Sequence, residues 1–229
     1  MRWQVIVVGG HTRSIGKTQL VCDLIAALPN ENWIAGKITQ YGHGVCAQNG
    51  ENCDCAPDDH VCAISWEKRA SETDSGRFLA AGARRAFWLR TKQGYLAEGM
   101  PLLRKALQHV DIENDLAPTR VILESNTLLQ FLKPSLYLMV LDPSKADFKE
   151  SARLQMDRAS AFVLRQPLDS AALNSGALNS GERPTAWHGL PLQLLRGKPQ
   201  FLQREGEALP AALLQQVQEI IHDAEGVSL

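Results

Sequence analysis

The decisive stretch of this chain reads Gly10-His11-Thr12-Arg13-Ser14-Ile15-Gly16-Lys17-Thr18. An apolar run at residues 3–8 precedes it, and residues 17–28 follow with apolar side chains at helical spacing. Glycines at both ends let the backbone turn tightly enough for its N–H groups to point inward at an anion. A helix that begins at Lys17 adds the partial positive charge of its N-terminus. The stretch therefore predicts a phosphate-binding loop between a first strand and a first helix.

Lys17 and Thr18 carry the side chains that such a loop needs to bind a nucleoside triphosphate. We expect the Lys17 ammonium to reach the β- and γ-phosphates and the Thr18 hydroxyl to ligate Mg²⁺. Compared with the pattern G-x-x-x-x-G-K-[ST], the loop has one extra residue, His11. The competing interpretation is an ordinary glycine-rich turn that a Lys-Thr pair follows by chance. The residues that we expect to contact the nucleotide here are Gly10, His11, Thr12, Arg13, Ser14, Ile15, Gly16, Lys17, Thr18 and Gln19.

Apolar runs alternate with amphipathic segments along the rest of the chain. Strands are expected at residues 3–8, 33–39, 86–91, 121–124, 136–141 and 161–164, and helices at residues 17–28, 77–83, 101–110, 148–159 and 210–222. Strands that alternate with helices form a parallel sheet with helices on both faces. We therefore predict a three-layer α/β fold of the P-loop NTPase type, as a single domain over residues 1–229. A Cys-rich insertion at 41–65 and a loop-rich segment at 167–208 are expected within it.

Charge and hydropathy argue against several classes of partner. The net charge of −1 and a pI near 6.6 give no electrostatic reason to expect nucleic acid or an anionic membrane. No apolar run approaches the roughly 18 residues of a membrane-spanning helix. The apolar start of the chain is short and leads into Gly9 and Gly10 rather than a signal-peptide cleavage region. We expect a cytoplasmic protein.

Two acids are candidates for holding the magnesium ion. Glu124 ends an apolar strand, where open α/β sheets bind their ligands, and its carboxylate suits Mg²⁺ directly or through water. Asp74 is the second candidate. Alternatively, Glu124 is a capping acid at the edge of the core and Asp74 is a helix N-cap. Arg77 either neutralises phosphate charge or pairs with Asp74.

The five residues between the glycines resemble the loop of dethiobiotin synthetase and its relatives in the SIMIBI branch of P-loop proteins. The segment 35–39 is similar to the second strand of that branch, and the resemblance implies that Lys37 lies near the nucleotide. Members of this branch often dimerise across the nucleotide edge, so the resemblance also implies a homodimer.

A narrower resemblance is to the molybdopterin-guanine dinucleotide biosynthesis protein B family. It rests on the stretch from Asp74 to Arg77, on Ala-Gly-Ala at 81–83 and on the strand that ends in Glu124, and it covers roughly residues 3–165. It implies that Asp74 and Arg77 lie in the nucleotide site. The chain departs from the family at 124–126, which read Glu-Ser-Asn instead of Glu-Gly, and at 165–167, which read Arg-Gln-Pro. GTP-specific relatives carry Asn-Lys-x-Asp at the latter position, so ATP and GTP are both candidates.

Four of the five cysteines fall within one short polar segment: Cys46, Cys53, Cys55 and Cys62, with His43 and His60 beside them. Four thiolates can close a tetrahedral zinc site or hold an iron–sulfur cluster. Reversible disulfides and thiols without a function are the alternatives. Cys22, within the first helix, is expected in the core.

These features together predict a nucleoside-triphosphate-binding protein, a slow Mg²⁺-dependent NTPase that assists the biosynthesis of a metal cofactor of the molybdopterin type with a partner protein. Slow turnover is expected because no residue in the sequence stands out as a base that would activate water. One alternative is an ATP-dependent ligase or kinase of the dethiobiotin synthetase kind. Another is a module that binds a metal or an iron–sulfur cluster without hydrolysing nucleotide. We also hypothesise that the state of the nucleotide is coupled to the cysteine site.

Overall fold

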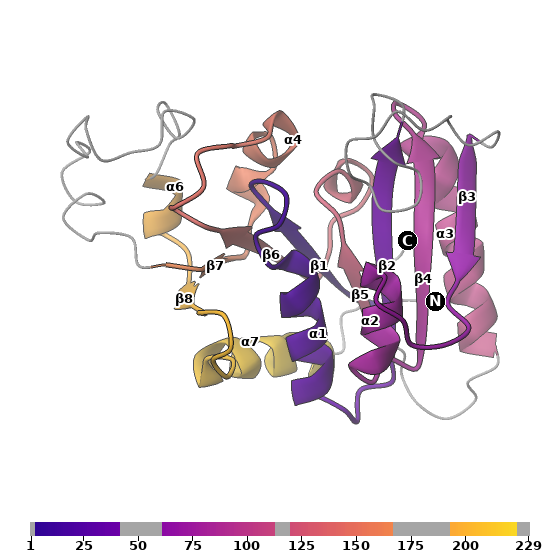
Figure 1. Cartoon of the computed structure of the whole chain (residues 1–229), viewed down its shortest axis with the longest axis horizontal. Coiled ribbons are helices and arrows are strands. Elements are labelled where there is room, and N and C mark those ends of the chain that lie inside the picture. Colours follow the sequence, from indigo (N-terminus) through magenta and orange to yellow (C-terminus); the bar gives the residue numbers. More distant parts are fainter. Residues whose placement is uncertain (1–2, 42–60, 113–119, 167–192, 224–229) are drawn as a thin grey trace.

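A single sheet forms the centre of the protein. The computed structural model describes residues 3–41, 61–112, 120–166 and 193–223. Within these residues, eight strands lie in the order β3-β4-β2-β5-β1-β6-β7-β8, and every neighbouring pair is parallel except β3 with β4 (Figure 1). The strands are β1 (Gln4–Gly10), β2 (Trp33–Tyr41), β3 (Cys62–Trp66), β4 (Arg85–Lys92), β5 (Arg120–Glu124), β6 (Leu136–Leu141), β7 (Ala161–Leu164) and β8 (Gln200–Leu202).

Strand β1 is the innermost element, and every one of its residues is buried. It pairs with β5 on one side and β6 on the other. Val5 and Val7 face one hydrophobic core while Ile6 and Val8 face the other. A parallel strand that is covered on both faces has to be apolar throughout, which is why the sequence of β1 shows no alternation.

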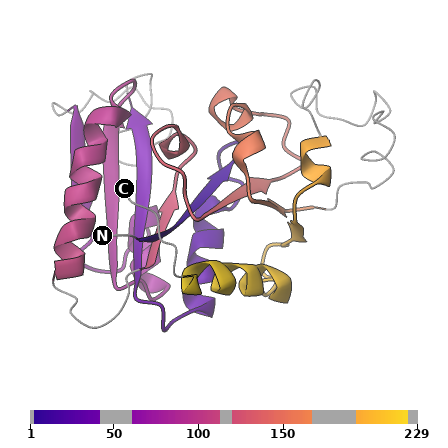
Figure 2. The same ribbon diagram turned by 180° about the vertical axis from the view of Figure 1, so that it is seen from behind.

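Helices cover both faces of the sheet. One layer contains α1 (Lys17–Ala27), α2 (Asp74–Ala80) and α7 (Ala211–His222). The other contains α3 (Leu96–Ile112), η1 (Leu128–Gln130), α4 (Glu150–Arg153), η2 (Met156–Arg158) and α6 (Gln193–Arg196). Figure 2 shows α3 lying along the sheet, where it packs on β3 and β4. The predicted three-layer α/β architecture is therefore confirmed. No helix in the part of the chain that the structure describes is long and apolar enough to cross a membrane.

The helix predicted at 148–159 is wrong, because two shorter turns, α4 and η2, replace it. Ala152 and Met156 still face the core, so both short turns satisfy the apolar periodicity. Arg158 donates hydrogen bonds to the backbone carbonyls of Leu129 and Leu132, and these bonds hold the second turn beside η1. A long-range side-chain contact thus ended a helix that the local pattern favoured.

Two helices begin earlier than predicted. Helix α2 begins at Asp74 rather than residue 77, because the Thr73 hydroxyl accepts a hydrogen bond from the N–H of Gly76 at 3.1 Å. Helix α3 begins at Leu96 and contains Pro101, which the sequence suggested as its first residue. Buried Leu96 anchors the additional turn against the core.

Strands β3 and β8 were not expected from the sequence. Strand β3 lies at a sheet edge with partly exposed residues, and its place depends on pairing with β4. It occupies the end of the insertion predicted at 41–65. Strand β8 has only three residues, too few to give a period, and together with α6 it adds regular structure to the segment predicted as loop at 167–208. Residues 42–60 and 167–192 lie outside the described residues.

Candidate functional site

The phosphate loop leaves β1 at Gly10 and enters α1 at Lys17. Gly16 is the N-cap of α1 and has a φ of 85°, a conformation that side chains with a Cβ rarely adopt. A Cβ at this position would also come within 2.4 Å of the Arg165 guanidinium. Both the turn and the close approach therefore require glycine at position 16.

Two side chains that the sequence did not single out for this role hold the ends of the loop. The amide of Asn126, just after β5, makes two hydrogen bonds of 2.7 Å with the N–H and carbonyl of Gly10. Arg165, just after β7, donates from Nε to the Ile15 carbonyl at 3.1 Å and from Nη2 to the Gly16 carbonyl at 2.5 Å. A third bond of 3.3 Å joins its Nη1 to the carbonyl of Gln203. Asn126 and Arg165 belong to the two segments, 124–126 and 165–167, in which the sequence departs from the family that it resembles. This departure was the only feature of the sequence that marked the two residues.

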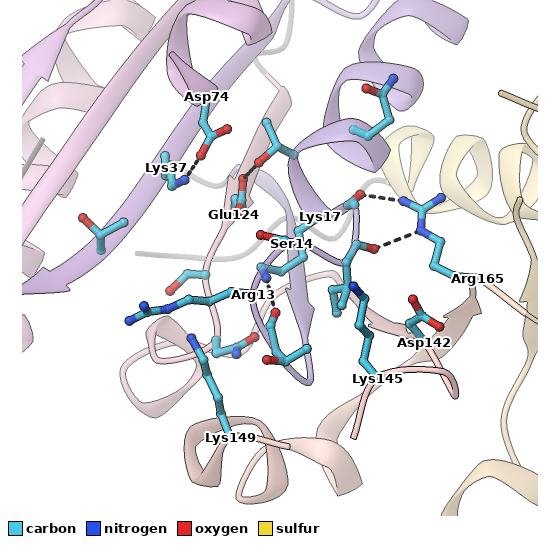
Figure 3. A pocket seen from close by; sticks show the side chains of 18 of the residues that line it. Arg13, Ser14, Lys17, Lys37, Asp74, Glu124, Asp142, Lys145, Lys149 and Arg165 are labelled. Atoms are coloured by element: carbon cyan, nitrogen blue, oxygen red, sulfur yellow. Dashed lines mark hydrogen bonds and ion pairs between the residues drawn. The ribbon is translucent and has the colours of Figure 1, made fainter. Parts of the chain in front are cut away.

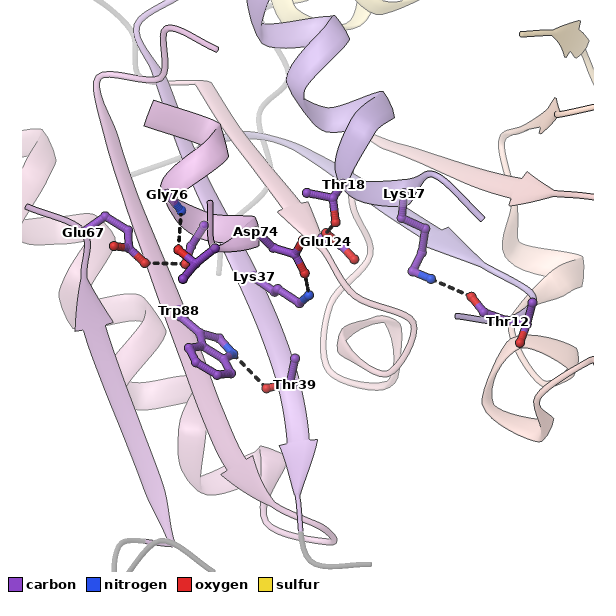
Figure 4. Close-up of polar contacts among 12 residues, drawn as sticks. Thr12, Lys17, Thr18, Lys37, Thr39, Glu67, Asp74, Gly76, Trp88 and Glu124 are labelled. Atoms are coloured by element: carbon purple, nitrogen blue, oxygen red, sulfur yellow. Dashed lines mark hydrogen bonds and ion pairs between the residues drawn. The ribbon is translucent and has the colours of Figure 1, made fainter. Parts of the chain in front are cut away.

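Lys17, Thr18 and Glu124 lie at the carboxyl edge of the sheet where α1 begins (Figure 4). The Lys17 ammonium donates to the Thr12 carbonyl at 2.6 Å, across the loop. Burial lowers the pKa of Lys17, and the nearby Glu124 carboxylate opposes that effect. The Thr18 hydroxyl donates to Glu124 Oε2 at 2.7 Å. A hydroxyl and a buried carboxylate therefore meet at one point, and both are hard oxygen ligands of the kind that Mg²⁺ takes.

A second polar group lies beside this point. Lys37 on β2 is in register with Glu124 on β5, and its ammonium forms an ion pair with Asp74 at the start of α2 (Figure 4). Thr73, not Asp74, caps α2, so the N-cap alternative for Asp74 is wrong. Arg77 Nη2 donates to Gln19 Oε1 at 2.5 Å and thereby links α2 to α1. The Asp74 carboxylate is thus engaged by Lys37, and Arg77 by Gln19.

His11, the extra residue of the loop, does not face the cleft. Its ring stacks on Phe148 with centroids 5.1 Å apart, and Nε2 lies 3.1 Å from the backbone carbonyl of Asp142. Burial and the neighbouring Lys17 lower the pKa of His11 to about 4. His11 is therefore a neutral core residue that attaches the loop to the segment after β6.

A cleft of about 1200 Å³ contains the loop and the carboxyl ends of β2, β5, β6 and β7 (Figure 3). Its positively charged lining residues are Arg13, Lys17, Lys37, Arg77, Lys145, Lys149, Arg165 and Arg204, and its acids are Asp74, Glu124, Asp142 and Glu205. The excess of cations suits a polyanionic ligand. Every residue from Thr12 to Gln19 lines the cleft, whereas Gly10 and His11 do not.

These observations can be compared with proteins of known structure. No protein-family model and no curated protein matches the chain. The crystal structure of HypB from Helicobacter pylori in complex with nickel is similar, with a TM-score of 0.50 and 12% identity over 96% of this chain and 85% of that chain. This chain has the fold of P-loop NTPases. At so low an identity the similarity establishes the fold alone, and function has to be argued from the site.

The predicted cysteine site falls mainly on residues outside the described ranges: Cys46, Cys53 and Cys55, as well as His43 and His60. Cys62 begins β3, and its thiol donates to the Tyr95 carbonyl at 3.4 Å. Among the residues that the structure describes, no group of three or more His, Cys, Asp and Glu side chains could hold a metal ion. Cys22 is buried in the core, as predicted, and burial raises the pKa of its thiol to about 11.

Proposed function

We propose that this protein binds a Mg²⁺–nucleoside triphosphate at the loop from Gly10 to Thr18 and hydrolyses it slowly. The observation that carries the proposal is the convergence of Lys17, Thr18 and Glu124 at the start of α1. The loop is held in place at both ends, by Asn126 and by Arg165. Donors that are already oriented stabilise a bound anion without first having to be ordered.

Each group at the site has a distinct task. The loop N–H groups and the N-terminus of α1 would bind the phosphates, and Lys17 would neutralise charge on the β- and γ-phosphates. Thr18 and Glu124 would hold Mg²⁺, with Asp74 as a further ligand if it leaves Lys37. The ion supplies positive charge where charge develops on the phosphates.

Slow turnover follows from the state of the acids in the cleft. Glu124 accepts from Thr18, Asp74 pairs with Lys37, and Asp142 accepts a hydrogen bond of 2.6 Å from the Ser144 hydroxyl. Three of the four lining acids therefore already have partners within the protein, which leaves none of these three poised to orient an attacking water. A partner protein that supplies or rearranges such a group would accelerate hydrolysis.

The role in the cell that we favour is assistance in assembling a metal cofactor, with a molybdopterin-type cofactor as one candidate. The polar cysteine segment and the nickel complex of the structurally similar HypB support metal handling. Arg165 makes its hydrogen bonds to backbone carbonyls of the loop and of Gln203, so no base-specific contact favours guanine over adenine at this position. We also propose that the protein forms a homodimer and acts with a partner protein in this assembly.

A ligase or kinase that uses a small second substrate is the other candidate. The cleft of about 1200 Å³ exceeds the roughly 300–1,000 Å³ of ordinary ligand pockets. Lys37, Thr39 and Gln40 line the part that extends along β2. Phosphate release that requires an added small acid or amine would favour this candidate, whereas release that a partner protein stimulates would favour the accessory NTPase. A coloured protein with no hydrolysis would favour an iron–sulfur module instead.

Calorimetric titration of ATP and of GTP, with Mg²⁺ present, tests the proposed function. We expect at least one of them to bind, and we expect Lys17→Ala to weaken binding by about a hundredfold, since a buried charge-assisted contact to phosphate is lost. Lys133→Ala, which changes an exposed lysine outside the cleft, is the matched control and should bind like the natural protein. Absence of binding at millimolar triphosphate, or undiminished binding by Lys17→Ala, would refute the proposal.

A further inference from the structure

The end of the cleft beyond Arg165 contains an acid that has no partner among the described residues. Arg204 and Glu205 follow β8 and line the cleft there, together with Gln166 after β7. The Arg204 guanidinium pairs with Glu207 at 3.4 Å rather than with Glu205. In the part of the chain that the structure covers, the exposed Glu205 carboxylate forms no ion pair and no hydrogen bond. Of the four acids that line the cleft, Glu205 is therefore the one that is free to contact a ligand.

The turn that carries Glu205 is held by its own hydrogen bonds. The side chain of Gln203 is 1% exposed, and its Nε2 donates to the carbonyl of Arg204 at 3.1 Å and to that of Glu207 at 2.8 Å. Gly206 has a φ of 78°, a conformation that favours glycine, and lets the chain turn back at this point. The position of Glu205 is therefore fixed by buried contacts of the residues around it.

Arg165 joins this turn to the phosphate loop. Its Nη1 donates to the Gln203 carbonyl at 3.3 Å, while its other two nitrogens donate to the carbonyls of Ile15 and Gly16. Burial lowers the pKa of Arg165, and nearby carboxylates that include Glu205 oppose that effect. One guanidinium therefore fixes the distance between the loop that would bind the phosphates and the turn that carries the free acid.

The phosphates of a bound nucleotide should point away from Glu205. Mg²⁺ bridges the β- and γ-phosphates, and its proposed position is beside Glu124 at the end of β5. Lys37 lies on that side as well, in register with Glu124. Figure 3 shows Lys37 on one side of Lys17 and Arg165 on the other. A free carboxylate repels phosphate, so the uncharged base is the part of the nucleotide that can lie beside Glu205.

The cleft is long enough for this arrangement. It continues from the loop past Asp142 and Ser144, after β6, to Arg165 and Gln166, after β7. Strand β8 is the third strand from β1 on this side of the sheet. Neighbouring strands lie about 4.8 Å apart, so the ends of β1 and β8 are separated by about 14 Å, which an extended nucleoside triphosphate can span.

A carboxylate at this end would distinguish the two common purines. An ionised carboxylate only accepts hydrogen bonds. Guanine presents two adjacent donors to it, N1–H and the 2-amino group, whereas adenine presents the lone pair of N1 in the corresponding place. A site that is built to bond a donor rejects the analogue that lacks the donor, because the polar group of the protein is then left unpaired.

We infer that the residues after β7 and β8 form the subsite for the base of the nucleotide, and that Glu205 makes this subsite selective for guanine by accepting hydrogen bonds from N1–H and the 2-amino group. The inference rests on the proposed nucleotide function and names the nucleotide within it, GTP rather than ATP. The phosphate loop binds the triphosphate of either nucleotide, and the turn after β8 selects between them.

Calorimetric titration of the full chain with non-hydrolysable triphosphate analogues of guanosine, adenosine and xanthosine, with Mg²⁺ present, tests this assignment. We expect the guanosine analogue to bind at least about tenfold more tightly than the adenosine analogue, as expected for charge-assisted hydrogen bonds. Glu205→Gln should remove most of this preference and should strengthen binding of the xanthosine analogue, whose 2-oxo group can accept from an amide. Glu207→Gln changes an exposed acid of the same turn that does not line the cleft, and this matched control should keep the preference for guanosine.

Two results would overturn the base subsite. One is equal affinity of the natural protein for the guanosine and adenosine analogues. The other is a preference for guanosine that persists in Glu205→Gln, including the case in which both analogues lose affinity equally because the carboxylate bonds the ribose. Failure of the proposed function is distinguishable, because then neither analogue binds, whereas failure of the base subsite alone leaves both analogues bound.

Discussion

His11 occupies the extra position of the loop, and its imidazole lies between the ring of Phe148 and the backbone of Asp142. The sequence suggested that this residue contacts the nucleotide, because it stands between Gly10 and Thr12. The structure instead buries it completely and leaves the cleft to the residues from Thr12 onward. An inserted loop residue has to be accommodated somewhere, and here the segment after β6 accommodates it.

Protonation of His11 should destabilise the protein in mild acid. Its pKa is about 4 when folded, below the ordinary value of 6.5, so the unfolded chain binds the extra proton first. The stability that neutral His11 contributes is fully present above pH 6.5 and is lost as the pH falls from 6.5 to 4, with about 3 kcal/mol lost by pH 4. Urea unfolding from pH 7 to pH 4 measures this loss. The free energy of unfolding of His11→Gln should differ from that of the natural protein by about 3 kcal/mol less at pH 4 than at pH 7. A difference that is the same at both pH values would contradict the prediction.

Lys149 gives a second prediction that depends on pH. Its pKa of about 8 means that the ammonium, facing Arg13, Lys17 and Asp147, loses its charge as the pH rises above 8. Anion binding raises that pKa, so affinity is fully present below pH 8 and declines above it. Between pH 7 and pH 9 we expect affinity for sulfate, whose charge is constant, to fall by about tenfold. Lys149→Gln should abolish most of this decline in sulfate affinity. An equal decline in that variant would show that a different titrating group causes it.

At the scale of elements, the site is an assembly of strand ends. Strand β1 supplies the loop, while its neighbour β5 supplies Glu124 and Asn126, and β7 supplies Arg165 two strands away. Arg165 also bonds to Gln203 and so connects the loop to the residues after β8. The conformation of the loop therefore depends on three strands that are far apart in sequence.

Loss of the hydrogen bonds from Arg165 to the loop should weaken nucleotide binding without unfolding the protein. Arg165→Ala deletes two hydrogen bonds to loop carbonyls, and we expect triphosphate affinity to fall by about tenfold or more. Arg165→Lys should not restore it, since an ammonium cannot form the same planar fork. Calorimetry measures the affinity and circular dichroism checks the fold. Arg196→Ala, an exposed arginine on α6, is the control. Undiminished affinity in Arg165→Ala would show that the loop keeps its shape unaided.

At the scale of the whole molecule, the ends of the cysteine segment meet at the edge of the sheet that holds the cleft. Tyr41 ends β2, and its carbonyl accepts from Gln93 at 2.7 Å, while the Val61 carbonyl accepts from Lys92 at 2.8 Å. Both contacts lie at the carboxyl end of β4. Tyr41 and Val61, which flank the cysteine segment, therefore lie at adjacent points on the carboxyl edge of the sheet.

This placement makes the coupling between metal and nucleotide testable. We expect anaerobically purified protein to contain zinc or iron by elemental analysis and Cys53→Ser/Cys55→Ser to lose it, because four thiolates close such a site. Triphosphate affinity or hydrolysis should then change by about fivefold or more, the lower end of typical coupling between two sites. Cys22→Ala, in the core, is the control that keeps the metal. Loss of metal with unchanged nucleotide affinity and hydrolysis would refute the coupling, and retention of metal would refute the cysteine site.

The sequence by itself determined the α/β fold and the position of the glycine-bounded loop between the first strand and the first helix. These features depend on contiguous residues: apolar strands, glycines at the turn and a helix that starts at Lys17. Only the tertiary structure decided what holds the loop and where its charges lie, because Asn126, Phe148, Lys149 and Arg165 reach it from strand ends more than 100 residues away. It also decided the length of α4 and the existence of β3, since partners distant in the chain outweigh local periodicity at these points.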